Sequence, residues 1–182
     1  MTKVMLADFL YSNNKGPSYF LAPLNIGYMA SYAKKVHGGL FDFRLYRDVD
    51  KFIKDFNAEK PDIIGFARYI WNDDLSKSIL KWIEHEHPKT ITICGGPMIG
   101  ASEESAAAFL DSNPLVDFCV TSYGEYGFSE FLQRYIDSDG NKARMKQEII
   151  PGVSFRENEA YCHSIVDQFM VKPDEIPSPY LT

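Results

Sequence analysis

Cysteine and histidine are scarce in this sequence, and neither is spaced for a disulfide framework or a metal site. The 182 residues include four histidines and three scattered cysteines, Cys94, Cys119 and Cys162. An odd number of cysteines, two of them in strand-like runs, indicates buried free thiols in a reducing cytoplasm. His85 and His87 lie two residues apart and would not share a helix face. We therefore predict no metal ligands and place the histidines at the surface.

Long apolar runs and basic clusters are also missing. The apolar segment after Met1 is too short for a signal peptide, and no run approaches the length of a membrane span. The formal charge is −6, from 19 basic and 25 acidic residues, without a run of Lys or Arg. We therefore expect neither a membrane nor a nucleic acid as partner. The hydrophobic share of 45% is that of a globular domain with a substantial core.

Strand-like and helix-like segments alternate along most of the chain. The expected strands cover residues 3–9, 41–46, 63–67, 90–94 and 115–120. Apolar residues at helical spacing follow each of them, and the expected helices begin near Leu24, Asp48, Asp73 or Asp74, Ser102 and Gly124. Five βα repeats predict an α/β fold with a five-stranded, doubly wound parallel sheet of the Rossmann or flavodoxin type.

The last quarter of the chain has a different character. Residues 153–162 predict a small β-hairpin, and the chain from residue 171 onward is rich in proline and expected to be extended. We therefore divide the sequence into an α/β domain (1–137), a hairpin extension (138–170) and a linker (171–182).

Glycines follow two of the expected strands. Gly95 and Gly96 precede Pro97, and Gly124 precedes Glu125. In alternating βα chains ligands bind at the carboxyl ends of the strands, where glycines let a large ligand approach the backbone. The glycines could also serve turns that need a positive φ. Glu125 could accept a hydrogen bond from a ligand, or only favour the positive end of the helix that follows.

Several well-known sites of such folds do not match. A phosphorelay receiver needs an acidic residue at the end of the third strand, where Arg68 and Tyr69 stand. Neither the Gly-x-Gly-x-x-Gly fingerprint nor a P-loop is present. The loop after the first strand, with Ser12 followed by Asn13 and Asn14, is a poor version of a flavodoxin phosphate loop.

Several motifs, taken in order, resemble the N-terminal cobalamin (B12)-binding domain of B12-dependent radical S-adenosylmethionine (SAM) enzymes. The resemblance covers roughly the first three quarters of the chain. The motifs are the first strand running into Asp8, Pro23-Leu24-x-x-Gly27-Tyr28, Pro-Asp-Ile-Ile-Gly at 61–65, Gly95-Gly96-Pro97 and Gly124-Glu125. The ending at 176–181 is similar to the segment by which such proteins enter their radical SAM barrel.

The resemblance implies a division of labour between this chain and a missing part. Residues 1–137 would bind cobalamin, and 171–182 would lead to the protein's own C-terminal radical SAM domain, holding a [4Fe–4S] cluster and SAM. The cluster motif Cys-x-x-x-Cys-x-x-Cys is absent from this sequence, so we expect the fragment alone to be non-catalytic, with no catalytic residues of its own. The expected reaction of the parent enzyme is methyl transfer.

The resemblance also implies which residues contact the cofactor. They lie at the strand ends, and they are Asp8, Leu10, Tyr11, Arg68, Tyr69, Gly95, Gly96, Pro97, Gly124 and Glu125. Gly95 and Gly96 would pack against the nucleotide tail of cobalamin, so a bulky Gly96→Leu should exclude the tail and leave the fold intact.

The wider cobalamin fold carries Asp-x-His-x-x-Gly after the first strand, and its histidine ligates cobalt from below. This chain has Leu10 at the histidine position and Asn13 at the glycine position. Leucine cannot ligate, so the resemblance implies a lower face lined by Leu10, Arg68 and Tyr69. Taken in isolation, Leu10 is more simply interpreted as a core residue. The corresponding alternatives for Tyr69 and Arg68 are a core residue and a surface charge.

Two alternatives stay open. The missing histidine favours a degenerate B12-type domain that acts as a docking or substrate-recognition module. A flavodoxin-like FMN-binding domain is the other, and it would be yellow rather than red or brown.

Overall fold

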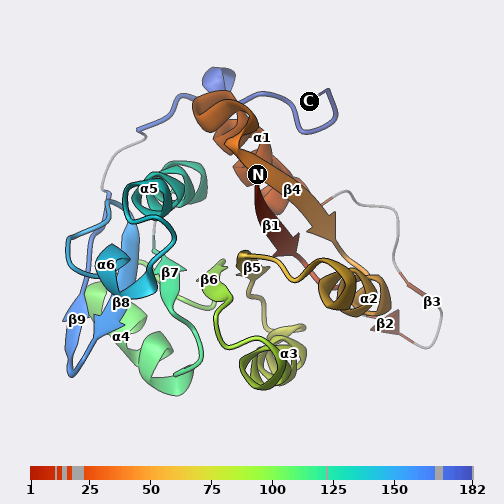
Figure 1. Ribbon diagram of the computed structural model, residues 1–182, viewed down its shortest axis with the longest axis horizontal. Helices are drawn as coiled ribbons and strands as arrows, with labels where there is room; N and C mark the ends of the chain where they lie inside the picture. The colour runs from red at the N-terminus through yellow and green to blue at the C-terminus, as the bar shows by residue number, and fades with distance from the viewer. Residues whose placement is uncertain (11, 14–15, 18–22, 122, 167–169, 182) are drawn as a thin grey trace.

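A single mixed sheet organises this chain, as the computed structural model in Figure 1 shows. The structure describes residues 1–10, 12–13, 16–17, 23–121, 123–166 and 170–181. The sheet has seven strands in the order β4 (Phe41–Tyr46), β1 (Thr2–Ala7), β5 (Ile63–Ala67), β6 (Ile91–Gly95), β7 (Phe118–Val120), β8 (Val153–Glu157) and β9 (Ala160–Cys162).

The predicted α/β class and the parallel core of the sheet are confirmed. The strands β4, β1, β5, β6 and β7 are parallel to one another and follow the doubly wound order in which the second strand lies outside the first. The prediction of five strands is wrong, because the hairpin β8–β9 continues the same sheet in antiparallel orientation. Without β8, the short strand β7 would present an unpaired edge.

Helices cover both faces of the sheet. Figure 1 shows α1 (Leu24–His37) and α5 (Gly124–Asp137) on one face. The other face is covered by α2 (Val49–Glu59), α3 (Asp73–Glu86) and α4 (Glu103–Ser112). Short elements complete the fold: α6 (Lys142–Met145), the turns η1 (Gly38–Leu40) and η2 (Pro173–Glu175), and the small hairpin of β2 (Ser12–Asn13) and β3 (Gly16–Pro17).

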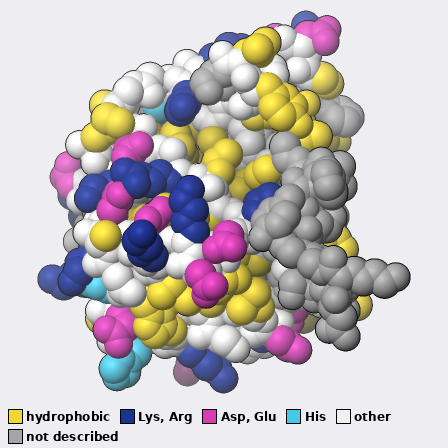
Figure 2. All heavy atoms as spheres, turned by 90° about the vertical axis from the view of Figure 1, so that its right-hand side faces the viewer, with side chains coloured by type: hydrophobic (Ala, Val, Ile, Leu, Met, Phe, Trp, Pro, Cys, Tyr) yellow, Lys and Arg dark blue, Asp and Glu magenta, His cyan; other side chains and the backbone are white. Residues whose placement is uncertain are grey.

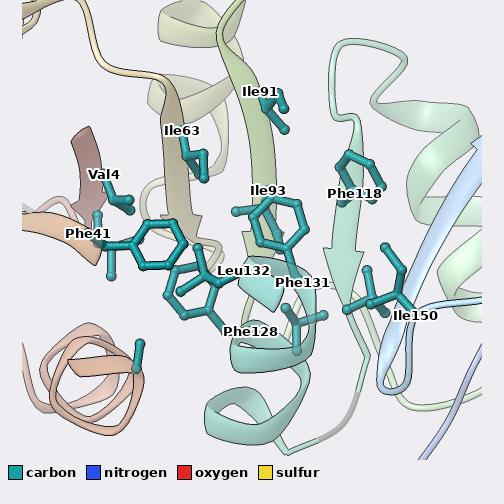
Figure 3. Close-up of a cluster of buried hydrophobic side chains, with 14 of the residues drawn as sticks. Val4, Phe41, Ile63, Ile91, Ile93, Phe118, Phe128, Phe131, Leu132 and Ile150 are labelled. Atoms are coloured by element: carbon teal, nitrogen blue, oxygen red, sulfur yellow. The ribbon is translucent and has the colours of Figure 1, made fainter. Parts of the chain in front are cut away.

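Side-chain alternation along each strand builds two cores. Ile63 of β5 belongs to the cluster under α1 and α5, and Ile64 belongs to the cluster under α2, α3 and α4. Figure 3 shows the first cluster, in which Phe131 of α5 points toward the strand residue Ile93. The side chains of both clusters are buried, so the sheet is a rigid floor for whatever lies at its edge.

Most of the helix ends follow from local chemistry. The predicted cap Asp48 accepts a hydrogen bond from the Lys51 amide at 2.7 Å, and Ser102 forms a capping box with Ser105. α3 begins at Asp73, as predicted, and its N-cap residue is Asn72.

β7 is shorter than the predicted strand 115–120. The Thr92 amide donates to the side chain of Asp117 at 3.0 Å rather than to a strand carbonyl, so the ladder begins only at Phe118.

The C-terminal segment packs along α1 instead of extending freely. Ser31 Oγ donates to the carbonyl of Pro177 at 2.8 Å, and Lys35 Nζ donates to the carbonyl of Glu175 at 2.6 Å. Pro179 lies against Gly27, and a Cβ added to Gly27 would be only 2.9 Å from the Cβ of Pro179. Since these α1 positions are four residues apart, the segment follows one stripe of α1 toward the carboxyl edge of the sheet.

The expectation of surface histidines is wrong for His37. This side chain is buried between α1 and α5, with Nε2 3.1 Å from the carbonyl oxygen of Ser129. The expected free, buried thiols are confirmed for Cys94 and Cys119, and burial raises the pKa of Cys94 to about 11.

The structure bears on two features of the sequence, its apolar segments and its charged side chains. In the described part of the chain, no helix combines the length and the hydropathy needed to cross a bilayer. Figure 2 shows basic side chains lying among acidic ones on the face that it presents. Arg44 and Glu59 are one such ion pair of the structure.

Candidate functional site

A cavity of about 250 Å³ opens at the carboxyl edge of the sheet, under α1 and α5. Its floor has two rows. The strand register places Leu6, Gly65 and Ile93 side by side in the deeper row. Ala67 and Gly95 are paired in the row nearer the strand ends. Three of these five floor residues have a single methyl group or no side chain, so the cavity occupies the space that larger side chains would fill.

The glycines at and beside the floor differ in what a side chain at each position would contact. A Cβ at Gly95 would find only the Val120 Cβ within reach, at 4.0 Å, so this position is open. A Cβ at Gly65 would meet the flexible end of Leu6 at 2.6 Å. Gly96 has φ 107°, and a Cβ there would lie 2.7 Å from the carbonyl oxygen of Arg68. Gly96 is therefore required by the conformation and close approach of the backbone. Gly65 and Gly95 lie on the floor of the cavity, where the lack of a side chain keeps the floor low.

Two helices form the apolar wall of the cavity. Ile26 and Met29 contribute from α1, and Gly124 and Phe128 contribute from α5. Both helices begin at the carboxyl edge of the sheet, since each follows a strand of the parallel core. Residues one turn into each helix therefore face the floor, and residues at the helix starts stand at the mouth.

A small polar network stands at the mouth. Asn25 Nδ2 donates to the hydroxyl of Tyr69 at 3.0 Å, and the Tyr69 ring stacks on Trp71 with centroids 4.4 Å apart. Burial raises the pKa of Asp8, while the charge of Arg47 and a hydrogen bond with Asn25 act against this rise. Asn25 thus links the end of β1 to the loop after β5.

The structure brings half of the predicted site residues together. Those that line the cavity are Tyr69, Gly95, Gly96, Gly124 and Glu125. Asp8 reaches it only through Asn25. Leu10 lies outside the lining, with its amide donating to the Arg47 carbonyl at 3.3 Å, and Pro97 is exposed beside the mouth. Tyr11 lies outside the described residues. Contact of any of these residues with a cofactor stays a prediction.

Arg68 is not where either interpretation placed it. Its side chain is completely buried on the opposite face of the sheet, under Phe109. Nε donates to Asp73 Oδ1 at 3.1 Å and Nη2 donates to Asn113 Oδ1 at 3.0 Å. Burial opposes ionisation of Asp73, but hydrogen bonds from Lys77 and Arg68 outweigh it and lower its pKa. Arg68 therefore ties β5 to α3 and α4, and the expectation that its side chain lines the ligand face is wrong.

Most residues that line the cavity were not among the predicted site residues, and Asn25, Gly65, Met29 and Phe128 are four of these. Gly65 had a signal, because a glycine inside an apolar strand often marks a close approach. Met29 has the spacing of a helix core residue, and only the tertiary structure shows that it borders a cavity.

The described residues contain no cluster of three or more His, Cys, Asp or Glu side chains that could hold a metal ion. None of the four histidines belongs to the lining of the cavity. The cavity is an apolar slot with a polar mouth, which is the form typical of sites for organic ligands.

No family model and no curated protein matches this chain. Solved structures of the cobalamin-dependent S-adenosylmethionine radical enzyme OxsB do match. The form with aqua-cobalamin bound has a TM-score of 0.71 and 22% identity, covering 100% of this chain and 24% of that chain. The form with aqua-cobalamin and S-adenosylmethionine has a TM-score of 0.67 and 19% identity, covering 92% and 22%.

The selenomethionine-labelled apo form of OxsB has a TM-score of 0.68 and 20% identity, covering 100% of this chain and 24% of that chain. This chain thus spans about a quarter of the length of OxsB. The similarity to a B12-dependent radical SAM protein that the sequence motifs suggest is confirmed at the level of the fold.

Proposed function

We propose that this domain binds cobalamin and inserts the nucleotide tail of the cofactor into the cavity beneath α1 and α5. The observation that carries the proposal is the open floor at Gly95, at the carboxyl end of β6 and next to Ala67 at the carboxyl end of β5. Ligands of doubly wound folds bind at that edge. The fold is shared with OxsB, which has been solved with aqua-cobalamin bound.

The size and polarity of the cavity fit one part of cobalamin. Pockets that enclose a whole small molecule measure roughly 300–1,000 Å³, and this cavity, at about 250 Å³, is smaller. It suits the flat, methylated benzimidazole of the tail, and the corrin ring would remain outside, over the strand ends. The ribose and phosphate between them would meet the polar mouth.

The residues of this chain would bind and orient the cofactor. Gly65 and Gly95 leave room for the ring, and Phe128 and Met29 would flank it. The Glu125 carboxylate, at the start of α5, can accept a hydrogen bond from a sugar hydroxyl. Bound cobalamin would supply a cobalt centre for methyl-transfer chemistry, which is the cofactor's own contribution.

For the intact protein we propose a radical SAM enzyme, with methyl transfer as its reaction. The cluster and SAM would belong to a further domain, and residues 1–182 alone would catalyse nothing. The C-terminal segment supports this arrangement, because it runs along α1 toward the mouth of the cavity. A domain that follows it would start beside the bound cofactor.

The test is a titration of the purified chain with hydroxocobalamin and, separately, with FMN. Calorimetry should show one cobalamin per chain, and gel filtration should retain a red protein. Saturable binding of FMN without cobalamin would favour the flavodoxin-like alternative. Absence of binding of both by a folded chain would favour a docking module.

A further inference from the structure

The interior of the cavity offers no side-chain hydrogen-bonding group. Its floor and walls are formed by the apolar side chains of Leu6, Ile93, Val120, Ile26, Met29 and Phe128. Cys94 and Phe66 also border the cavity, but their side chains belong to the core cluster on the other face of the sheet. The backbone groups of β5 and β6 are used in pairing with neighbouring strands. Within the described residues, a polar atom placed deep in this slot would therefore meet no side-chain donor or acceptor.

The polar lining residues all stand at the mouth. Asn25 and Glu125 belong to the first turns of α1 and α5, and Tyr69 follows the end of β5 by two residues. Asn25 is also held in place, because its Oδ1 accepts from the Ile26 amide at 2.8 Å and its Nδ2 donates to Tyr69. The site thus separates a polar entrance, suited to ribose and phosphate, from an apolar end that receives the base.

We infer that the cavity discriminates between corrinoids by the base at the end of the tail, and that it selects an apolar benzimidazole over a purine. This inference rests on the proposed function. Dimethylbenzimidazole presents carbon-bound hydrogens and two methyl groups to the wall. Adenine of similar shape adds ring nitrogens and an amino group, which would lose their water partners and find none in the slot.

The expected discrimination follows from leaving one or two polar groups buried without partners. Such groups reduce affinity by about 10- to 100-fold. Hydrophobic matching alone discriminates poorly between rings of similar size, so this preference should come almost wholly from polarity.

The experiment compares three probes on the purified chain: cobalamin, a cobamide with adenine as its base, and cobinamide, which lacks the base. All three carry cyanide on cobalt, and calorimetry gives the dissociation constants. We expect cobalamin to bind at least tenfold more tightly than the adenine cobamide, with cobinamide no tighter than the latter.

Two variants introduce a polar atom into the slot at nearly unchanged volume. Val120→Thr adds a hydroxyl to the floor, and Met29→Gln adds an amide to the α1 wall. Each variant should bind the adenine cobamide more tightly, and so reduce the ratio of the affinity for cobalamin to that for the adenine cobamide. Val116→Thr is the matched control, because Val116 is buried in the cluster on the opposite face, and it should leave the ratio unchanged. Thermal unfolding of each variant shows that the fold is retained.

Equal affinity for the two bases, both above cobinamide, would overturn the inference and leave the proposed function standing. Equal affinity for cobalamin and cobinamide would overturn it too, since the base would then lie outside the cavity. If a folded chain binds no corrinoid at all, the proposed function itself is wrong.

Discussion

Replacing Gly95 with leucine should fill the cavity and leave the backbone undisturbed. A Cβ at this position has only the Val120 Cβ within 4 Å, at 4.0 Å, and Gly95 is not among the glycines with positive φ. Gly96→Leu is not an equivalent test. Gly96 has φ 107° and its Cβ would clash with the Arg68 backbone at 2.7 Å, so the expectation that this variant leaves the fold intact is wrong.

The magnitude follows from the volumes. A leucine side chain adds four carbon atoms, each occupying roughly the 30 Å³ of a water molecule, or about 120 Å³ in all. That is about half of the cavity of about 250 Å³, and the remainder cannot hold a two-ring base. Cobalamin should then bind Gly95→Leu no more tightly than cobinamide does. Stability should not fall, because four carbons buried among apolar walls contribute up to about 3 kcal/mol.

The assay is calorimetry with cobalamin and cobinamide, together with urea denaturation of each protein. Gly39→Leu is a matched control: Gly39 has a negative φ, no atom near its Cβ, and an exposed position beyond the far end of α1. The control should bind like the unsubstituted chain. If folded Gly95→Leu binds cobalamin with undiminished affinity, the tail does not enter this cavity and the reasoning is refuted.

Three further predictions concern the framework around the cavity. Gly27→Val would collide with Pro179, so limited proteolysis should cut residues 173–181 faster; unchanged cleavage would mean that the segment is not held on α1. Asp73→Asn weakens the pairing of buried Arg68 and should lower the free energy of unfolding by about 2 kcal/mol, without changing the corrinoid affinity of the folded chain; a loss of affinity alone would place Arg68 at the ligand. Burial lowers the pKa of His37 below 6.5, despite its hydrogen bond to a carbonyl. The unfolded chain therefore binds more protons below that pH, and the free energy of unfolding between pH 7.5 and 5.5 should fall more than in His37→Gln.

Local signals in the sequence predict the elements of this fold well. The βα alternation and the start of a helix at Asp48 depend on neighbours within a few residues, and both are confirmed. The strand count was wrong because pairing is not a local property. The hairpin is evident from the sequence, but its attachment to β7 depends on an edge that only the folded sheet presents.

The candidate site was predictable where it follows from chain order. Glycines at strand ends must share one edge of a parallel sheet, and Gly95 and Gly124 do line the same cavity. The α1 contribution was not predictable, because helical spacing shows that Met29 faces inward but not what lies opposite. The side that Arg68 faces follows once the structure shows that Ala67 faces α1, because the next residue then points away.

Alternation along β5 also explains why one strand can serve the ligand and the framework together. Ile63, Gly65 and Ala67 face α1 and α5, and the side chains become small toward the carboxyl end. Residues of the other face keep their bulk, and the strand there continues into Arg68, which is tied to α3 and α4. The floor of the cavity is thus held from behind by a fully packed core. A slot supported in this way is formed before the ligand arrives, so binding requires little ordering of the protein and more of the contact energy appears as affinity.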